Sequence, residues 1–487
     1  MKTLTLLFLL ISGFGIRFLR WLAWFQQKEY RLDRIGLFLR SREGVKEFWR
    51  LLPKKNDFSR IGLKRPKMTP RALLTAFLSL SLLVLVIILV WACGWQIVVL
   101  TVLSLYLLLP LIILLATLPL ELAKWLITLY WLNKASLLIK KHQPIVIGVT
   151  GSYGKTSSKL LLAAVLSQKY SVFATPGSFN TKLSIAQVIS RQYQGEKLVI
   201  IEYAAYTTGE IATLTKFFPP QIAVITGLTE QHLGLFGSLQ KIVQAKAELV
   251  RALPVDGKVF VNALDGGADQ ILMVGKSLRA GIDNLVRISY GLNSDRNIIF
   301  GLAADGRLKV KWQDKTWLTK LIGFQYQPQI GLCLRFGEEF GLDQKTILDS
   351  LANFQPSEEN FISSYCLNGG TRVIDDGGSS NPVGFQTALE LVGQLPAERK
   401  ILVTAGIVDL GKESTKVHQF LAQLAAIKVN EVWYLGQTGQ AEFKQFLKGR
   451  VIEDQTAILK RLAKLNADDL LLIEGRMPSW FYGKINF

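Results

Sequence analysis

A glycine-rich turn between a predicted strand and a predicted helix is the stretch of this sequence best suited to chemistry. The apolar residues 145–149 predict a buried strand, and the leucine- and alanine-rich residues 160–166 predict a helix. Between them, residues 148–156 read Gly-Val-Thr-Gly-Ser-Tyr-Gly-Lys-Thr. A strand that turns directly into a helix aims backbone N–H groups and the positive end of the helix dipole at one point. We therefore expect this turn to bind phosphate groups.

The side chains of the turn suit a nucleoside triphosphate that carries Mg²⁺. Gly151 and Gly154 allow the backbone to curl close to a phosphate. Lys155 can reach the β- and γ-phosphates, and the Thr156 hydroxyl can hold the metal. ATP and Mg²⁺ are the predicted cofactors, and an ordinary tight turn before a helix is the alternative. The predicted cofactor-binding residues of the turn are Thr150, Gly151, Ser152, Gly154, Lys155, Thr156 and Ser157.

Two further predicted strands end near polar residues that could lie beside this turn. Residues 198–202 are a buried strand with Glu202 at its C-terminal end. Residues 222–226 are a second such strand, and His232 follows it. Ligands of open α/β sheets bind at the carboxyl ends of the strands. His232 is one of only three histidines, and at this edge we expect it to contact metal or phosphate rather than to be structural.

Strand-like and helical runs alternate over residues 144–357, which predicts a parallel sheet flanked by helices. A strand at residues 259–262 ends in Asn262, and Asp265 follows; both are candidates for adenine or ribose contacts. Lys246 lies in a predicted helix, and taken alone it would be a solvated lysine.

Residues 358–487 predict a second α/β domain of Rossmann-like order. Helical stretches such as residues 384–395 and 417–426 separate its apolar runs. The predicted strands are residues 372–376, 400–404, 431–435 and 469–473. The fold class expected for the whole chain is thus α/β, preceded by transmembrane helices.

The first 140 residues predict a membrane anchor. Residues 72–120 contain no charged side chain, whereas one helix needs about 20 apolar residues to cross the hydrocarbon core. We expect two crossings, at about residues 72–93 and 96–118. The alternative is a helical hairpin buried in a soluble core. For the apolar run at residues 3–16 the alternatives are a short span, an interfacial helix and a signal peptide.

A basic segment precedes the apolar run. Residues 17–71 hold 16 lysines and arginines against 5 acidic residues, and the whole chain has a net charge of +20. Such a segment is expected on the cytoplasmic side, against anionic lipids. We expect no nucleic-acid partner, because no nucleic-acid-binding module is recognisable. The three cysteines are scattered, which favours a reducing cytoplasm for the soluble part.

Several stretches, in order along residues 145–487, resemble motifs of the Mur ligase family, which makes bacterial cell-wall peptide bonds with ATP. The resemblance is greatest to the branch that adds D-Ala-D-Ala to the UDP-MurNAc tripeptide. Besides the turn, the matching stretches are residues 174–181 (Ala-Thr-Pro-Gly-Ser-Phe-Asn-Thr), 201–211 (Ile-Glu-Tyr-Ala-Ala-Tyr-Thr-Thr-Gly-Glu-Ile), 230–238 (Glu-Gln-His-Leu-Gly-Leu-Phe-Gly-Ser), 375–382 and 400–411.

The resemblance implies roles for individual residues. Glu202 and His232 would hold Mg²⁺ together with Thr156. Lys246 matches the family lysine that becomes a carbamate and bridges a metal. Asn262 matches the nucleotide-contacting asparagine, and Asp376 would contact nucleotide after domain closure. The implied catalytic residues are Lys155, Glu202, His232 and Lys246, and the implied metal ligands are Thr156, Glu202, His232 and Lys246.

The sequence departs from the family pattern at both ends. The family's N-terminal domain, which grips the UDP part of the substrate, is replaced by the predicted membrane helices. The family's nucleotide-contacting arginine aligns with Asn360. Its tyrosine and asparagine in the Asp-Asp motif align with Gly378 and Ser379.

The resemblance implies an ATP-dependent amide ligase at the bacterial inner membrane, with its catalytic domains on the cytoplasmic side. Its partners would be a cell-wall precursor peptide, an amino acid or dipeptide, and membrane lipids. One alternative is a ligase that acts on a lipid-linked precursor or on a polymer such as poly-γ-glutamate. Another is an ATP-binding scaffold for wall synthesis, which the intact phosphate-binding turn and metal set argue against.

Overall fold

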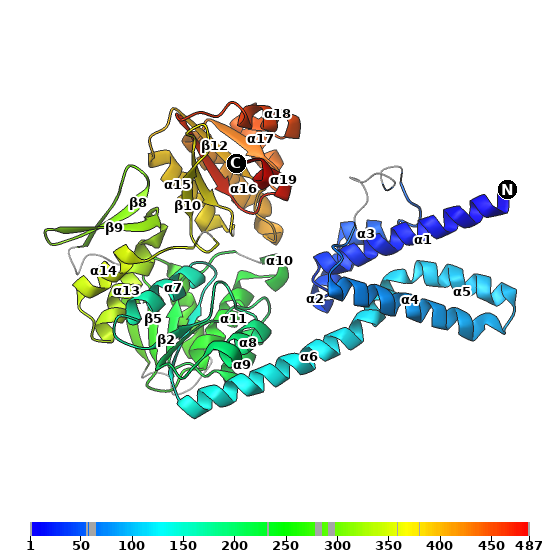
Figure 1. Cartoon of the computed structure of the whole chain (residues 1–487), viewed down its shortest axis with the longest axis horizontal. Coiled ribbons are helices and arrows are strands. Elements are labelled where there is room, and N and C mark those ends of the chain that lie inside the picture. The colour runs from blue at the N-terminus through cyan, green and yellow to red at the C-terminus, as the bar shows by residue number, and fades with distance from the viewer. Residues whose placement is uncertain are drawn as a thin grey trace. The chain divides into compact units, whose positions relative to one another are not determined.

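The computed structural model describes residues 2–54, 57, 65–230, 233–277, 285–290, 298–357, 359–378 and 380–485. The chain divides into two compact units, Met1–Tyr130 and Trp131–Phe487 (Figure 1).

The first unit has helices and no strand among its described residues. Helices α4 and α5 lie antiparallel, joined by a turn at Gly94, whose φ of 99° favours glycine (Figure 1). Thr69 caps the start of α4, because its side chain accepts a hydrogen bond from the Ala72 N–H at 3.2 Å. The helices are α1 (Lys2–Gln27), α2 (Leu32–Arg40), α3 (Arg42–Phe48), α4 (Pro70–Trp91), α5 (Trp95–Leu107) and α6 (Leu109–His142).

The second expected membrane crossing is not one continuous helix. Helix α5 ends at Leu107 and α6 begins at Leu109, next to Pro110, which has no N–H to continue the α5 hydrogen-bond ladder. Arg17 of α1 satisfies carbonyl groups near this break, since its guanidinium donates to the carbonyls of Leu107 at 3.5 Å and Arg50 at 2.8 Å. Hydrogen bonds from Arg17, within the same unit, therefore stabilise the break between α5 and α6.

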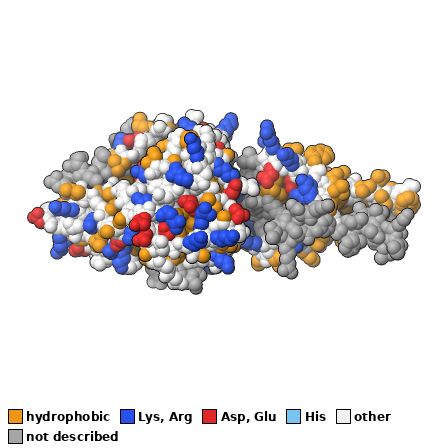
Figure 2. All heavy atoms as spheres, turned by 90° about the horizontal axis from the view of Figure 1, so that it is seen from above, with side chains coloured by type: hydrophobic (Ala, Val, Ile, Leu, Met, Phe, Trp, Pro, Cys, Tyr) orange, Lys and Arg blue, Asp and Glu red, His pale blue; other side chains and the backbone are white. Residues whose placement is uncertain are grey.

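The first unit buries aromatic side chains inside and exposes apolar ones outside. Trp24 of α1 stacks on Phe38 of α2 at 4.2 Å between ring centroids. By contrast, Phe77 and Trp91 of α4 are 66% and 73% exposed. Two described helices, α4 and α6, are long and apolar enough to cross a membrane, by length and composition alone. Figure 2 shows hydrophobic side chains prevailing toward the right-hand end of this unit.

The second unit contains a six-stranded parallel sheet in the order β2-β3-β1-β4-β5-β6. Its strands pair in parallel throughout, as the sequence predicts for residues 144–357. The strands are β1 (Ile145–Thr150), β2 (Val172–Ala174), β3 (Leu198–Glu202), β4 (Ile222–Ile225), β5 (Lys258–Asn262) and β6 (Val286–Tyr290).

Helices cover both faces of this sheet, because the strands are apolar on both sides. One face packs on α8 (Lys182–Gln192), α9 (Glu210–Phe217), α11 (Leu239–Arg251), α12 (Gly266–Ser277) and residues 131–142 of α6. The other face packs on α7 (Lys155–Leu166), α13 (Gln327–Glu339) and α14 (Gln344–Asn353). Val146 and Ile147 of β1 point to opposite faces accordingly.

A small antiparallel sheet adjoins the second of these faces. Its strands are β7 (Ile298–Leu302), β8 (Arg307–Trp312) and β9 (Lys315–Ile322). In β8, Leu308 and Val310 are buried while Lys309 and Lys311 are exposed, so the strand covers the core with one side only.

The C-terminal part of the second unit forms another sheet, in the order β10-β11-β15-β12-β13-β14. All its pairs are parallel except β10 with β11. This arrangement, with the first sheet, confirms the predicted α/β fold class. The strands are β10 (Ser363–Cys366), β11 (Arg372–Asp376), β12 (Arg399–Thr404), β13 (Glu431–Tyr434), β14 (Val451–Ile452) and β15 (Asp469–Glu474). The helices are α15 (Pro382–Gln394), α16 (Ser414–Lys428), α17 (Gln440–Leu447), α18 (Gln455–Leu462) and α19 (Ser479–Ile485).

A buried histidine should make this domain sensitive to acid. His418 of α16 is fully buried; its Nε2 accepts from the Ile407 N–H at 3.0 Å, and Nδ1 faces the Ser414 carbonyl at 2.7 Å. Burial lowers the pKa of His418 below 6.5. Unfolding frees the ring to bind a proton, so stability is present above about pH 6.5 and is lost as the pH falls. We expect the melting temperature to fall from pH 7.5 to 5.5, and to fall less in His418→Gln. Equal falls in both proteins would contradict this.

Candidate functional site

The predicted phosphate-binding turn is residues 151–154, between β1 and α7. Gly154 caps α7 with a φ of 70°, a left-handed conformation that favours glycine. A Cβ atom on Gly151 would lie only 1.9 Å from Thr226 Oγ1, so no side chain fits there. Both glycines of the turn are thus required by its geometry.

The turn is tied to the end of β4, the strand next to β1. The Ser152 N–H donates to the Gly227 carbonyl at 2.8 Å, and the Thr226 hydroxyl donates to the Tyr153 carbonyl at 2.5 Å. The Tyr153 hydroxyl in turn donates to Asp265 at 2.5 Å. The chain leaves β1 toward β2 and β3 on one side and leaves β4 toward β5 and β6 on the other, so the turn after β1 lies at the switch point where α/β sheets bind ligands.

Lys155 is placed to serve a bound anion. Its ammonium donates to the carbonyls of Gly151 at 2.9 Å and Ser152 at 3.1 Å, over the turn itself. Burial lowers the pKa of Lys155, and the nearby carboxylate of Glu202 opposes that shift. A phosphate at the turn would replace these contacts to neutral carbonyls with an ion pair to an anion.

Glu202, at the carboxyl end of β3, meets the first turn of α7. Its Oε2 accepts from the Thr156 hydroxyl at 2.8 Å, and its Oε1 accepts from the Asn180 amide at 3.0 Å. A hydroxyl beside a carboxylate supplies the oxygen ligands that Mg²⁺ takes when it also binds phosphate. This pair therefore fits Mg²⁺ carried by a nucleotide.

Lys246 is not the solvated lysine that its helix alone suggests. Its side chain is 5% exposed, and its ammonium donates to the Gly151 carbonyl at 2.7 Å. Burial lowers the pKa of Lys246 well below its usual value, and the charge of Lys155 lowers it further. Only the interpretation from the helix taken alone is wrong, because α11 packs this face against the turn. The structure brings Lys246, Lys155 and Glu202 to one point.

Other predicted residues use their side chains within the protein. Asn262 donates to the Thr226 carbonyl at 3.0 Å and accepts from the Leu264 N–H at 3.1 Å. The hydroxyl groups of the remaining turn residues donate to backbone carbonyls: Thr150 to Tyr203 at 2.9 Å, Ser152 to Thr229 at 3.1 Å and Ser157 to Gly154 at 3.1 Å. These hydrogen bonds fix the shape of the turn and of the strand end beside it.

Some predicted positions lie elsewhere. His232 and Ser379 lie outside the described residues. Asp376 ends β11 in the C-terminal sheet, where burial raises its pKa to about 7 and the neighbouring Asp375 adds to the rise. Asn360 donates to the Ser357 hydroxyl at 2.9 Å. Across the described part of the chain, no three His, Cys, Asp or Glu side chains are grouped to hold a metal.

Sequence reasoning missed Lys159, which contacts Glu202 at 3.4 Å. Its side chain is fully buried, and burial lowers its pKa while Glu202 opposes the shift. The sequence does contain an indication of this role. Lys159 lies four residues after Lys155, on the same face of the helix, and only apolar residues follow it to the end of that helix.

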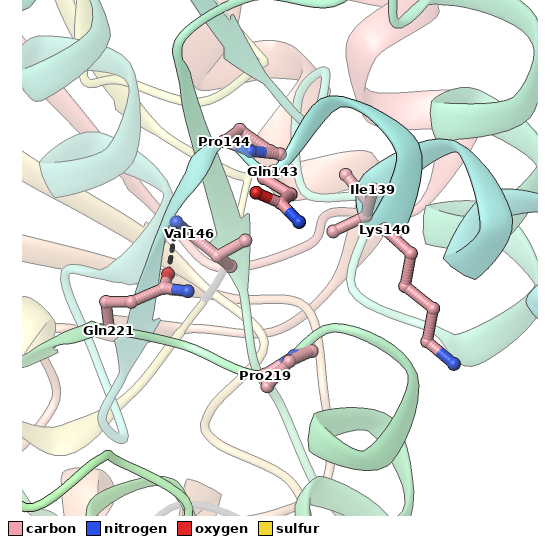
Figure 3. Close-up of a pocket in the computed structure, with 7 residues that line it drawn as sticks. All are labelled: Ile139, Lys140, Gln143, Pro144, Val146, Pro219 and Gln221. Carbon is pink, nitrogen blue, oxygen red and sulfur yellow. Dashed lines mark hydrogen bonds between the residues drawn. The ribbon is translucent and has the colours of Figure 1, made fainter.

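A pocket of about 420 Å³ lies at the opposite edge of the same sheet (Figure 3). It lies at the amino ends of β1 and β4, where the Gln221 side chain accepts from the Val146 N–H at 2.6 Å. Its lining residues are Ile139, Lys140, Gln143, Pro144, Val146, Pro219 and Gln221. Because β1 runs from this pocket to the turn, the pocket is separate from the candidate site.

Residues 149–323 match the Mur ligase middle domain. A UDP-N-acetylmuramoyl-tripeptide–D-alanyl-D-alanine ligase of Mycobacterium tuberculosis is 31% identical over 289 residues, which cover 58% of this chain and 56% of that protein. The Escherichia coli ligase of the same name is 26% identical, covering 67% of this chain and 72% of that protein. The chain thus matches little more than half the length of the most similar of these relatives.

Solved structures share the fold. MurF from Acinetobacter baumannii has a TM-score of 0.61 at 20% identity, covering 72% of this chain and 77% of that protein. MurF from Thermotoga maritima, solved in complex with ADP, has a TM-score of 0.60 at 23% identity, covering 74% and 82%. The resemblance seen in the sequence motifs is confirmed at the level of the Mur ligase fold and middle domain.

Proposed function

We propose that this chain, which carries a Mur ligase middle domain, is an ATP-dependent amide ligase of peptidoglycan precursor synthesis, similar to MurF. The observation that carries the proposal is the convergence of Lys155, Glu202 and Lys246 on the phosphate-binding turn. The named relatives join D-alanyl-D-alanine to a UDP-muramoyl tripeptide, and the ADP complex of a MurF supports nucleotide binding at this fold.

The proposed chemistry proceeds through an acyl phosphate. A substrate carboxylate attacks the γ-phosphate of ATP and ADP leaves. An amine then attacks the acyl carbon, phosphate leaves and the amine loses a proton. Lys155 would neutralise the charge that develops on the transferred phosphoryl group. Mg²⁺, held by Thr156, Glu202 and His232, would supply further charge neutralisation at the phosphates. Asn262 is proposed to contact the nucleotide, and Asp376 is proposed to contact it after domain closure.

The buried position of Lys246 supports its proposed conversion to a carbamate. A carbamate forms when a neutral amine attacks CO₂ and releases a proton. The lowered pKa of Lys246 favours that neutral amine. The resulting anion would be a ligand for a bound metal ion, whereas a free ammonium would repel that cation.

The first unit is proposed to anchor the ligase at the inner membrane, with the catalytic unit in the cytoplasm. The exposed apolar side chains of α4 support this, because soluble monomers rarely expose large apolar patches. The net basic segment 17–71 supports contact with anionic lipids.

The anchor makes a direct prediction about extraction. The full chain should sediment with membranes through washes at high salt and alkaline pH, and should be released only by detergent, because apolar burial in lipid does not depend on salt. Centrifugation followed by immunoblotting measures this, with a peripheral membrane protein as control. A chain found in the supernatant after the salt wash would contradict the anchor.

A second candidate, a lipid-linked acceptor, is favoured by one observation. The match covers only 56% of the Mycobacterium tuberculosis relative. In this chain, the matched region is preceded by the apolar helical unit Met1–Tyr130. Purified full-length protein in detergent should be incubated with ATP, Mg²⁺ and either a soluble or a lipid-linked wall precursor plus amine donors. Phosphate release and product mass then identify the acceptor. Nucleotide binding without phosphate release for any precursor would favour the scaffold alternative.

A further inference from the structure

Lys159 is a second lysine of α7, and its ammonium is hydrogen-bonded to groups of the protein itself. Its ammonium donates to the Gly177 carbonyl at 2.5 Å, to the Thr175 hydroxyl at 3.2 Å and to Glu202 Oε2 at 3.4 Å. An ammonium has three N–H donors, and all three are used. Lys159 is therefore not a second phosphate-binding lysine.

Glu202 is held from two directions by groups that the sequence separates widely. Helix α7 supplies Thr156 and Lys159 to Oε2, while Asn180 approaches Oε1 at 3.0 Å. A carboxylate with donors on both oxygens cannot rotate without breaking one of them. Its orientation toward the turn is thereby fixed.

The same lysine fixes the segment that carries Asn180. Residues 175–181 connect β2 to α8, and the Lys159 bond to the Gly177 carbonyl lies at the middle of this connection. Thr181 secures its far end through a capping box with Ser184. Lys159 thus joins Glu202 and the Asn180 segment into one arrangement.

We infer that Lys159 is a positioning residue that orients Glu202 for Mg²⁺ through this shared contact, an inference that rests on the proposed function. Groups that orient a metal ligand typically change metal affinity by about 10- to 100-fold when they are removed. Burying a charged pair is costly, and an apolar replacement of both partners is often no less stable. Packing alone therefore does not account for a charged pair at this position.

Lys159→Met in the full-length protein in detergent tests the inference. Binding of a fluorescent ADP analogue is titrated with Mg²⁺ and is also measured in EDTA. We expect the half-saturating Mg²⁺ concentration to rise about 10- to 100-fold. Binding in EDTA should be unchanged, because Lys155 and the turn remain intact.

Lys169→Met is the matched control, because it is the same substitution just beyond the same helix. The Lys169 ammonium donates to the carbonyls of Phe340 at 3.1 Å and Gly341 at 2.9 Å, away from Glu202. We expect its Mg²⁺ dependence to equal that of the wild type.

A folded Lys159→Met protein with the wild-type Mg²⁺ dependence would overturn the inference. If Lys159→Met shows no cooperative melt, Asn180→Ala takes its place, since it removes the other hold on Glu202 from a partly exposed segment. It should also raise the Mg²⁺ requirement, and an unchanged requirement would overturn the inference equally. A wild-type chain that binds no nucleotide would instead overturn the proposed function.

Discussion

Replacing Lys155 with alanine should lower ATP turnover by about 10²- to 10³-fold, the loss typical when one charge-stabilising donor is removed from a reacting centre. In the structure the ammonium contacts only carbonyls of the turn, Gly151 and Ser152, among the hydrogen bonds of the described residues. The Gly151 carbonyl keeps its bond from Lys246 in the variant. The fold should therefore survive, and the melting temperature should stay close to that of the wild type.

Phosphate release under saturating ATP measures this effect, and Lys169→Ala is its control. Lys169 follows the same helix, but its contacts are with Phe340 and Gly341. That variant should turn over at the wild-type rate. If a folded Lys155→Ala protein turned over ATP at the wild-type rate, the phosphate-binding role of the turn would be contradicted. The proposed ligase activity, which depends on that role, would be contradicted as well.

The sequence predicts the central strands well because parallel strands buried on both faces are continuous apolar runs. Residues 198–202 were expected as a strand and form β3 with the same bounds. Strands β1, β4 and β5 differ from expectation by one residue at one end. The turn is also predictable from the sequence. Its backbone geometry requires glycine at particular positions, so the spacing of the glycines reveals the turn.

Other elements depend on pairing rather than on local pattern. Strand β2 has three residues and β14 has two, and each is defined by its partner strand. The β7–β9 sheet was also not predicted, although β8 alternates buried and exposed side chains. From the sequence alone, the lysines of β8 resemble those of a solvent-exposed loop. The buried residues between them become meaningful only once the strand is seen to cover the core beside the parallel sheet.

Burial of a single lysine cannot be read from sequence. Lys241 and Lys246 lie in the same helix α11, yet Lys241 is exposed and Lys246 is buried. The difference arises because Lys246 faces the end of β1, which is distant in sequence. Similarly, Lys159 becomes significant only when β3 brings Glu202 beside α7.

Replacing Lys246 with methionine should abolish ligation and yet stabilise the protein. Burial lowers the pKa of Lys246 in the folded state, so the side chain binds a proton more readily once the protein unfolds. A base with a lowered folded-state pKa costs stability increasingly as the pH falls below its unfolded value of about 10.4. Methionine fills a similar volume without that cost, and the Gly151 carbonyl keeps its bond from Lys155 at 2.9 Å.

We therefore expect the melting temperature of Lys246→Met to rise by about 2 °C or more at pH 7, and by less at pH 9.5. Scanning calorimetry in bicarbonate-free buffer measures this, with Lys241→Met as the exposed control that should change nothing. Activity supplies the second readout: bicarbonate should stimulate phosphate release by the wild type, and should leave Lys246→Met inactive. If the variant melted at a lower temperature than the wild type, the Lys246 side chain would be protonated in the folded protein and would stabilise it. A fully active variant would show that the amine takes no part in the reaction, and the carbamate would have to be abandoned even if the stability prediction held.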